Sequence, residues 1–119
     1  MNILIIDNNG EFALSLKDIV GLYGHEAVVT GDSRSALKLA ASGEFDLILT
    51  DMVMPGESGI SILQSLEEIG SPAPVVVISA LSDEKVKKRA LELGAAGYLE
   101  KPINIPALRS LLKSLQTRN

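Results

Sequence analysis

Residues 46–59 read DLILTDMVMPGESG, and the interpretation of the whole chain starts from this stretch. The uncharged residues 47–50 precede a single acid, Asp51, and a Pro-Gly pair follows at positions 55 and 56. A short apolar run that ends at turn residues is typical of a buried strand, so we expect Asp51 at the carboxyl end of that strand. A carboxylate among apolar neighbours is costly unless it meets cations or takes part in chemistry. Asp51 is therefore the first candidate functional residue.

Strand-like and helix-like segments alternate along the chain on both sides of this stretch. Continuous apolar or β-branched runs predict strands, whereas apolar residues at a spacing of three or four predict helices. The expected strands cover residues 2–6, 25–30, 46–50, 75–79 and 97–100. The first expected helix contains Phe12 and follows residue 10, and another covers residues 60–69. The other three are expected to begin at Asp32 or Ser33, at Ser82 and at Asn104.

This fivefold β–α alternation predicts an α/β fold. We expect residues 1–119 to form a single three-layer (βα)5 doubly wound domain around a five-stranded parallel sheet. The strands are almost continuously apolar, which indicates a sheet that helices cover on both faces. A chain of 119 residues is long enough to build a hydrophobic core without crosslinks.

Composition excludes several classes of function. The chain has no cysteine and only one histidine, His25, so thiolate zinc sites, disulfides and histidine-based triads are excluded. The net charge is −4 and the chain contains two Phe, two Tyr and no Trp, which argues against direct nucleic-acid binding by this domain. No apolar run is long enough to span a membrane, so we expect a cytoplasmic protein without a membrane partner.

Polar side chains stand where the predicted strands end. In an open α/β sheet, ligands bind outside the carboxyl ends of the strands. Two acids and an amide are expected there, together with a serine hydroxyl and a lysine: Asp7, Asn8, Asp51, Ser79 and Lys101. Carboxylate and amide oxygens suit Mg²⁺, and a lysine and a hydroxyl suit the oxygens of a phosphoryl group. The pattern predicts a site that handles phosphoryl groups.

In this order, these residues resemble the receiver domain of two-component response regulators over essentially the whole chain. The resemblance rests on Asp7, TDMVMPGESG around Asp51, Ser79-Ala80, Gly97-Tyr98 and Lys101-Pro102. It implies a flavodoxin-like, chemotaxis-type fold with strand order 2-1-3-4-5. It also implies a cis peptide bond before Pro102.

The resemblance further implies which residue accepts the phosphoryl group and which groups bind the metal. Asp51 would accept a phosphoryl group from a histidine kinase or phosphotransfer protein in a Mg²⁺-dependent reaction. The metal ligands would be Asn8, Asp51 and the main-chain carbonyl of Val53, and Asp7 would hold a metal-bound water.

The same resemblance assigns the remaining polar groups. Lys101 would pair with one phosphoryl oxygen and Ser79 would hydrogen-bond another. Ser79 and Tyr98 would act as a switch that alters the surface of the fourth helix, fifth strand and fifth helix. A downstream output domain or effector protein is the further partner that such a surface implies.

One position departs from the family pattern, because the second of two usual adjacent acids is Asn8 here. Its amide can still bind Mg²⁺, but a negative charge is lost and weaker binding is expected. The alternative function is a receiver-like interaction module that works without phosphorylation. A flavin- or nucleotide-binding protein of similar fold is a third hypothesis, although residues 7–10 lack the glycine-rich pattern of a phosphate cradle.

Two apolar positions bear on the lifetime of the phosphorylated form. Val53 lies two residues after Asp51, and Leu81 lies two residues after Ser79. In receivers these positions flank the phosphoryl group, and neither side chain here orients a water. Slow self-hydrolysis of the phosphorylated acid is expected.

Several of these residues also have a simpler structural interpretation. Asp7 alone is typical of a turn acid, and Lys101 alone of a solvated lysine. Tyr98 is also compatible with a plain core position, and the basic residues of 85–89 with a solvated helix face.

Overall fold

A computed structural model describes residues 1–54, 57–80 and 83–116 of the chain. Strands and helices alternate from the first residues to the last. The main strands are β1 (Asn2–Ile6), β2 (Glu26–Thr30), β3 (Leu47–Thr50), β6 (Val75–Ser79) and β7 (Gly97–Glu100). The helices are α1 (Gly10–Leu22), α2 (Ser33–Ala41), α3 (Gly59–Glu68), α4 (Glu84–Glu92) and α5 (Ile105–Gln116).

The five main strands form one parallel sheet in the order β2-β1-β3-β6-β7. Counting only these strands, the order is 2-1-3-4-5, so the predicted flavodoxin-like arrangement is confirmed. Strand β2 lies on one side of β1, and all later strands of this sheet lie on the other side. The switch point therefore lies between β1 and β3, which places the ends of these strands where ligands bind in such sheets.

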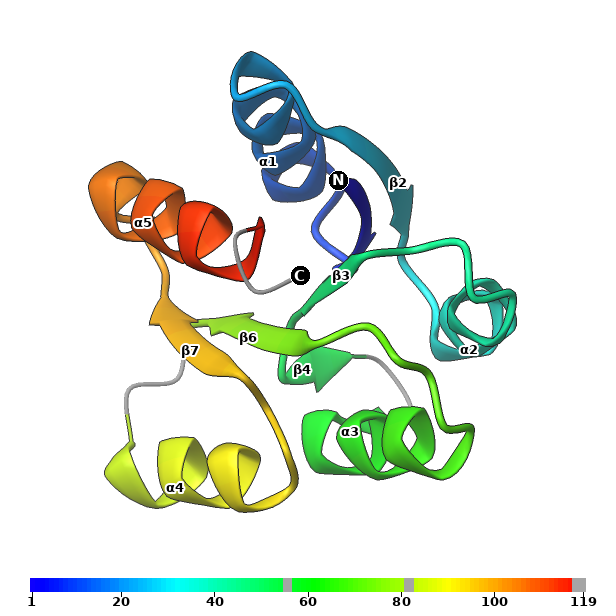
Figure 1. The fold of residues 1–119 in the computed structure, drawn as a ribbon. Coiled ribbons are helices and arrows are strands. Elements are labelled where there is room, and N and C mark those ends of the chain that lie inside the picture. The colour runs from blue at the N-terminus through cyan, green and yellow to red at the C-terminus, as the bar shows by residue number, and fades with distance from the viewer. Residues whose placement is uncertain (55–56, 81–82, 117–119) are drawn as a thin grey trace.

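Helices cover both faces of the sheet, as Figure 1 shows. Helices α1 and α5 lie on one face, and α2, α3 and α4 lie on the other. Successive side chains of a strand point to opposite faces. Accordingly Ile3 and Ile5 of β1 pack in the core beneath α1 and α5, whereas Leu4 and Ile6 pack against α2 and α3. Each face of the sheet therefore has its own hydrophobic core.

Polar residues begin four of the helices in the described part of the chain. At α5 the side chain of Asn104 accepts a hydrogen bond from Ala107 N at 2.9 Å, which confirms the predicted start of this helix. The side chain of Asn9 accepts a hydrogen bond from the first turn of α1, and Asp32 does so for α2, which confirms the predicted cap. The prediction that Ser82 caps α4 was wrong, because the N-cap is Asp83, whose carboxylate accepts from Lys85 N at 2.8 Å. Ser82 itself lies outside the described residues.

The remaining differences from the expected elements are small. Strand β2 begins at Glu26 instead of at residue 25, and β3 begins one residue after Asp46. Asp46 lies just before β3, and its carboxylate accepts a hydrogen bond from Asn2 N at 2.8 Å, which links the starts of β1 and β3. The sequence did not predict a short antiparallel pair, β4 (Val53–Met54) with β5 (Glu57–Ser58), after Asp51. The Lys101–Pro102 bond is cis, as the resemblance implied.

Within the described ranges, no helix combines the length and the apolar character that crossing a membrane requires.

Candidate functional site

The backbone brings the predicted site residues to one edge of the sheet. Asp51 follows β3, and its N–H donates to Ile6 O at the end of β1, 2.9 Å away, so Asp51 lies beside Asp7. Lys101 follows β7, and its N–H donates to Ser79 O at 2.8 Å. The hydrogen-bond ladder of the sheet thus continues one residue past each strand. This continuation fixes the positions of the site residues before their side chains form any contact.

Lys101 joins the two carboxylates. Its Nζ lies 2.8 Å from Asp7 Oδ2 and 3.1 Å from Asp51 Oδ2. The side chains of Asp7 and Asp51 are 4% and 9% exposed, and that of Lys101 is 18% exposed. The shared cation compensates one of these two buried negative charges and so lowers the cost of burying them. The solvated-lysine interpretation of Lys101 is therefore wrong.

The electrostatics of the site keep Lys101 protonated. Burial alone lowers the pKa of Lys101, but the hydrogen bonds and charges of Asp7 and Asp51 outweigh it and raise the pKa above its usual value. Lys101 therefore remains a cation at neutral pH. A permanent positive charge next to Asp51 is what an incoming anion requires.

Asp7 has a structural role as well as a place in the site. Its Oδ1 accepts a hydrogen bond from Asn9 N at 2.8 Å, while its Oδ2 accepts from Lys101. Asn9 in turn caps α1 by accepting from Phe12 N at 3.1 Å. The turn-acid interpretation of Asp7 is therefore confirmed, and its functional role stays a prediction that the contact of the other oxygen with Lys101 allows.

Ser79 and Tyr98 lie next to this cluster and contact each other. Ser79 is fully buried. Burial raises the pKa of the Tyr98 hydroxyl, and a side-chain hydrogen bond with Ser79 opposes that rise. The charge of Asp51 also acts on the Tyr98 hydroxyl, which shows that the tyrosine lies within electrostatic reach of the site. The two residues that the resemblance assigns to the switch are therefore directly connected.

Helix α4 holds Tyr98 from the outside. Lys87 Nζ lies 5.8 Å from the centre of the Tyr98 ring and forms ion pairs with Glu100 and with Glu84. This lysine is consequently engaged within the domain, whereas Lys85 and Lys88 on the same helix are exposed to solvent. The basic stretch of α4 is only in part a solvated face.

Two further predicted positions receive less support from the described structure. Asn8 is exposed at the same edge as Asp7, between β1 and α1. The backbone of Val53 belongs to β4, but its side chain lies outside the described residues, as does Leu81. The metal-binding role of the Val53 carbonyl and the effect of both apolar residues on hydrolysis stay predictions.

The donor set suits a small hard cation. Two carboxylates that share one ammonium are close enough to face one ion, and Asn8 can add an amide oxygen. Among the residues that the structure describes, no three Asp, Glu, His or Cys side chains form a group that could hold a metal ion. A divalent cation held here would need further oxygen ligands from water or from a bound group.

The sequence did not reveal that Phe12 contacts Lys101. Lys101 Nζ lies 4.2 Å from the centre of its ring. In the sequence, Phe12 appears only as the first apolar residue of a helical pattern. No local signal links Phe12 to Lys101, which is far away in the sequence, so only the folded chain could reveal the pair.

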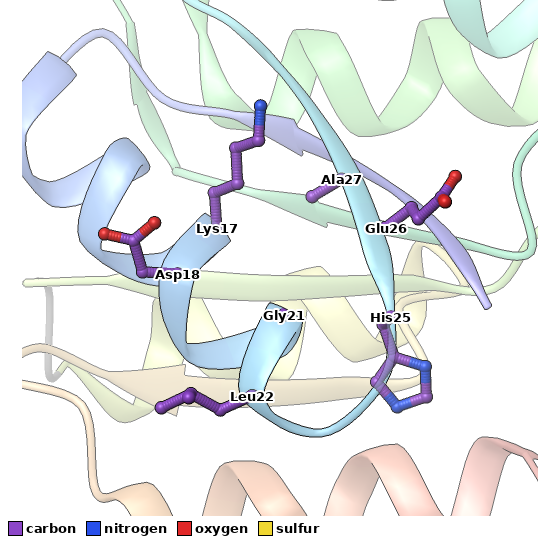
Figure 2. A pocket seen from close by; sticks show the side chains of 7 residues that line it. All are labelled: Lys17, Asp18, Gly21, Leu22, His25, Glu26 and Ala27. Carbon is purple, nitrogen blue, oxygen red and sulfur yellow. The ribbon is translucent and has the colours of Figure 1, made fainter.

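The open hollow in Figure 2 lies elsewhere on the molecule. The second half of α1 and the start of β2 form it, near the end of the sheet opposite to the carboxylates. In Figure 2 the charged tips of Lys17, Asp18 and Glu26 point in different directions. His25 is buried at its edge, where Nδ1 lies 2.8 Å from the amino group of Met1, so this histidine has a structural contact with the N-terminus.

Comparisons with known proteins agree with this geometry. The family model of the response regulator receiver domain matches residues 3–113. The receiver domain of the Francisella response regulator 1452 is 31% identical with a TM-score of 0.90, covering 98% of this chain and 97% of that one.

Two further similar proteins are longer than this chain. A Burkholderia pseudomallei response regulator, solved with a phosphorylated aspartic acid, a calcium ion and citrate, is 31% identical with a TM-score of 0.84, covering 98% of this chain and 66% of that one. The transcriptional regulatory protein CpxR of Escherichia coli is 32% identical, over 98% of this chain and 50% of that protein. The chain spans about half the length of such curated relatives, or less.

Proposed function

The chain belongs to the response regulator receiver domain family of two-component systems, and on that premise we propose that Asp51 is its phosphoryl acceptor. Receiver domains are signalling domains and not enzymes in the usual sense. The observation that carries the proposal is the Lys101 ammonium, 2.8 Å from Asp7 and 3.1 Å from Asp51. The buried carboxylate of Asp51 therefore lies next to the Lys101 cation at the carboxyl edge of the sheet.

The proposed reaction is a transfer of one phosphoryl group. An oxygen of Asp51 forms a bond to phosphorus, and the bond from phosphorus to the donor breaks. With a phosphohistidine of a kinase or phosphotransfer protein as donor, the imidazole leaves with the bonding electron pair and takes up a proton. The receiver itself supplies the nucleophile, which is covalent catalysis.

Lys101 and Ser79 would stabilise the transferred group. Lys101 is already within hydrogen-bond distance of Asp51, so a small movement of its ammonium lets it pair with a phosphoryl oxygen. The Ser79 hydroxyl, on the neighbouring strand, would donate to another oxygen. Because Ser79 also contacts Tyr98, that donation would link phosphorylation to the position of the tyrosine.

A divalent cation completes the proposal. Asp7, Asp51 and Asn8 would hold Mg²⁺, together with the main-chain carbonyl of Val53. Mg²⁺ bound there offsets the negative charge that otherwise repels a phosphoryl group from two carboxylates. The calcium ion and phosphorylated aspartic acid belong to the similar Burkholderia protein, and they support the assignment by similarity alone.

The proposed partners follow from the same premise. A histidine kinase or a phosphotransfer protein donates the phosphoryl group. An output domain or a separate effector receives the signal through the surface of α4, β7 and α5.

A phosphate-independent interaction module is the second candidate function. The observation that favours it is Asn8, which lies exposed where the family has a second acid. This candidate predicts that the native protein does not form an adduct at any Mg²⁺ concentration.

The test is the intact mass of the protein after incubation with Mg²⁺ and acetyl phosphate. We expect a single phosphoryl adduct that disappears in Asp51→Asn and in the presence of a chelator. Asp32→Asn is the matched control, because it makes the same chemical change at an exposed cap that asparagine can still form. Absence of the adduct from the native protein, or its persistence in Asp51→Asn, contradicts the proposal.

A further inference from the structure

The Lys101 ammonium has a third neighbour besides the two carboxylates. Lys101 Nζ lies 4.2 Å from the centre of the Phe12 ring, well within the range of a cation–π contact. An ammonium has three N–H donors, and the bonds to Asp7 and Asp51 account for two of them. Two anions and one aromatic face therefore surround a cation whose side chain is 18% exposed.

The ring of Phe12 is held in place by its own element. Phe12 belongs to the first turn of α1, and its N–H donates to the capping side chain of Asn9 at 3.1 Å. The ring is partly buried and packs against the core beneath α1 and α5. The aromatic face is therefore a fixed wall of the site.

The proposed function, on which this inference rests, requires Lys101 to change partners. In the free domain the ammonium bonds an oxygen of Asp51, and after transfer it would bond an oxygen of the phosphoryl group. An aromatic face attracts a cation electrostatically, carries no formal charge and imposes little direction on the N–H groups. It can retain the ammonium while the hydrogen bonds are exchanged.

We propose that Phe12 is a positioning residue for phosphoryl transfer, which acts by holding Lys101 against Asp51. The simpler interpretation is that Phe12 only fills the core beneath α1. The two interpretations differ in what an apolar residue without a ring should do. Leucine fills much of the same space but has no aromatic face, whereas tyrosine retains the face.

The first test is the initial rate of adduct formation with acetyl phosphate at saturating Mg²⁺. We expect Phe12→Leu to lower the rate about threefold, the size of a partly exposed cation–π contact, and Phe12→Tyr to restore most of it. Tyr23→Leu is the matched control, because Tyr23 ends the same helix and its ring also faces a cation, Arg109, at 5.8 Å. It should not alter the rate.

The second test asks whether the effect passes through the lysine. In a Lys101→Ala background, Phe12→Leu should have no further effect on the residual rate, because the cation is gone. Phe12→Met serves in the same comparison if Phe12→Leu does not fold. Any of three results would overturn the inference: a native rate in Phe12→Leu, the same loss of rate in Phe12→Leu and Phe12→Tyr, or a full loss from Phe12→Leu in the Lys101→Ala background. The proposed function would still stand in each case, provided that the native protein forms the adduct. A native protein that forms no adduct overturns both.

Discussion

At the scale of single residues, charge balance governs the site. Asp7 and Asp51 contribute two negative charges and Lys101 one positive charge, which leaves one net negative charge in a largely buried cluster. With an aspartate in place of Asn8 the cluster would carry two. Asn8 thus lowers the negative charge at this edge of the sheet, which weakens the attraction for a divalent cation.

This balance predicts the effect of restoring the second acid. Asn8→Asp should tighten Mg²⁺ binding roughly tenfold, because a carboxylate replaces a neutral amide beside two others. Isothermal titration calorimetry measures the change. Asn9→Asp is the control, since it adds the same charge one residue away on a side chain that is occupied at the cap of α1. Equal tightening in both variants would show that general charge, and not ligation at position 8, is responsible.

At the scale of elements, the start of α1 organises one side of the site. Asn9 donates its N–H to Asp7 and accepts from Phe12 with its side chain. A single turn therefore orients both an acid and the ring that faces Lys101. On the opposite side, α4 holds Tyr98 through Lys87. The site lies between two helix starts and the edge of the sheet, and each of them restrains different side chains.

The cap of α1 can be tested by itself. Asn9→Ala should lower the free energy of unfolding by about 1 kcal/mol, because an N–H group in the first turn loses its acceptor. Urea denaturation followed by circular dichroism measures this change. Asn9→Ser keeps a capping oxygen and should retain most of the stability. A serine variant as unstable as the alanine variant would mean that the side chain of Asn9 acts in some way other than capping.

At the scale of the whole molecule, hydrophobic clusters pack against both faces of the sheet. Leu112 of α5 is 2% exposed and belongs to the core that also contains residues of α1, β1, β3 and β6. Leu22 at the end of α1 is 84% exposed. Both are leucines on helices that cover the same face, so burial is the main difference between them.

This contrast predicts two very different losses of stability. Leu112→Ala should reduce the free energy of unfolding by about 2–5 kcal/mol, a large part of what a domain of this size has. Leu22→Ala should change it by less than about 0.5 kcal/mol. Chemical denaturation of both variants provides the measurement. Similar values for the two would contradict the assignment of the core.

The local pattern of the sequence was sufficient for most of the fold. The bounds of β1, β6 and β7 are those predicted, because continuous apolar runs between turn residues are decided within a few positions. Once the strands were known to be parallel, Asp7, Asp51, Ser79 and Lys101 had to share an edge. These four candidate residues could therefore be derived from the strand pattern, whereas Tyr98 and the Val53 carbonyl came only from the family resemblance. The Asp83 cap was missed because the neighbouring Ser82 offers an equally good capping signal. The β4–β5 pair was missed because strands of two residues are too short to show an apolar alternation.

The contacts between these residues were decided only by the tertiary structure. Lys101 meets Asp7 and Asp51 across 94 and 50 positions of sequence, and such a meeting depends on strand order, sheet register and side-chain direction together. The Phe12 ring against Lys101 and the bond between Ser79 and Tyr98 arise in the same way. Periodic patterns show which residues stand at an edge, since they reflect the local backbone. Which of those residues touch is settled by packing between distant elements, for which a single sequence carries no local signal.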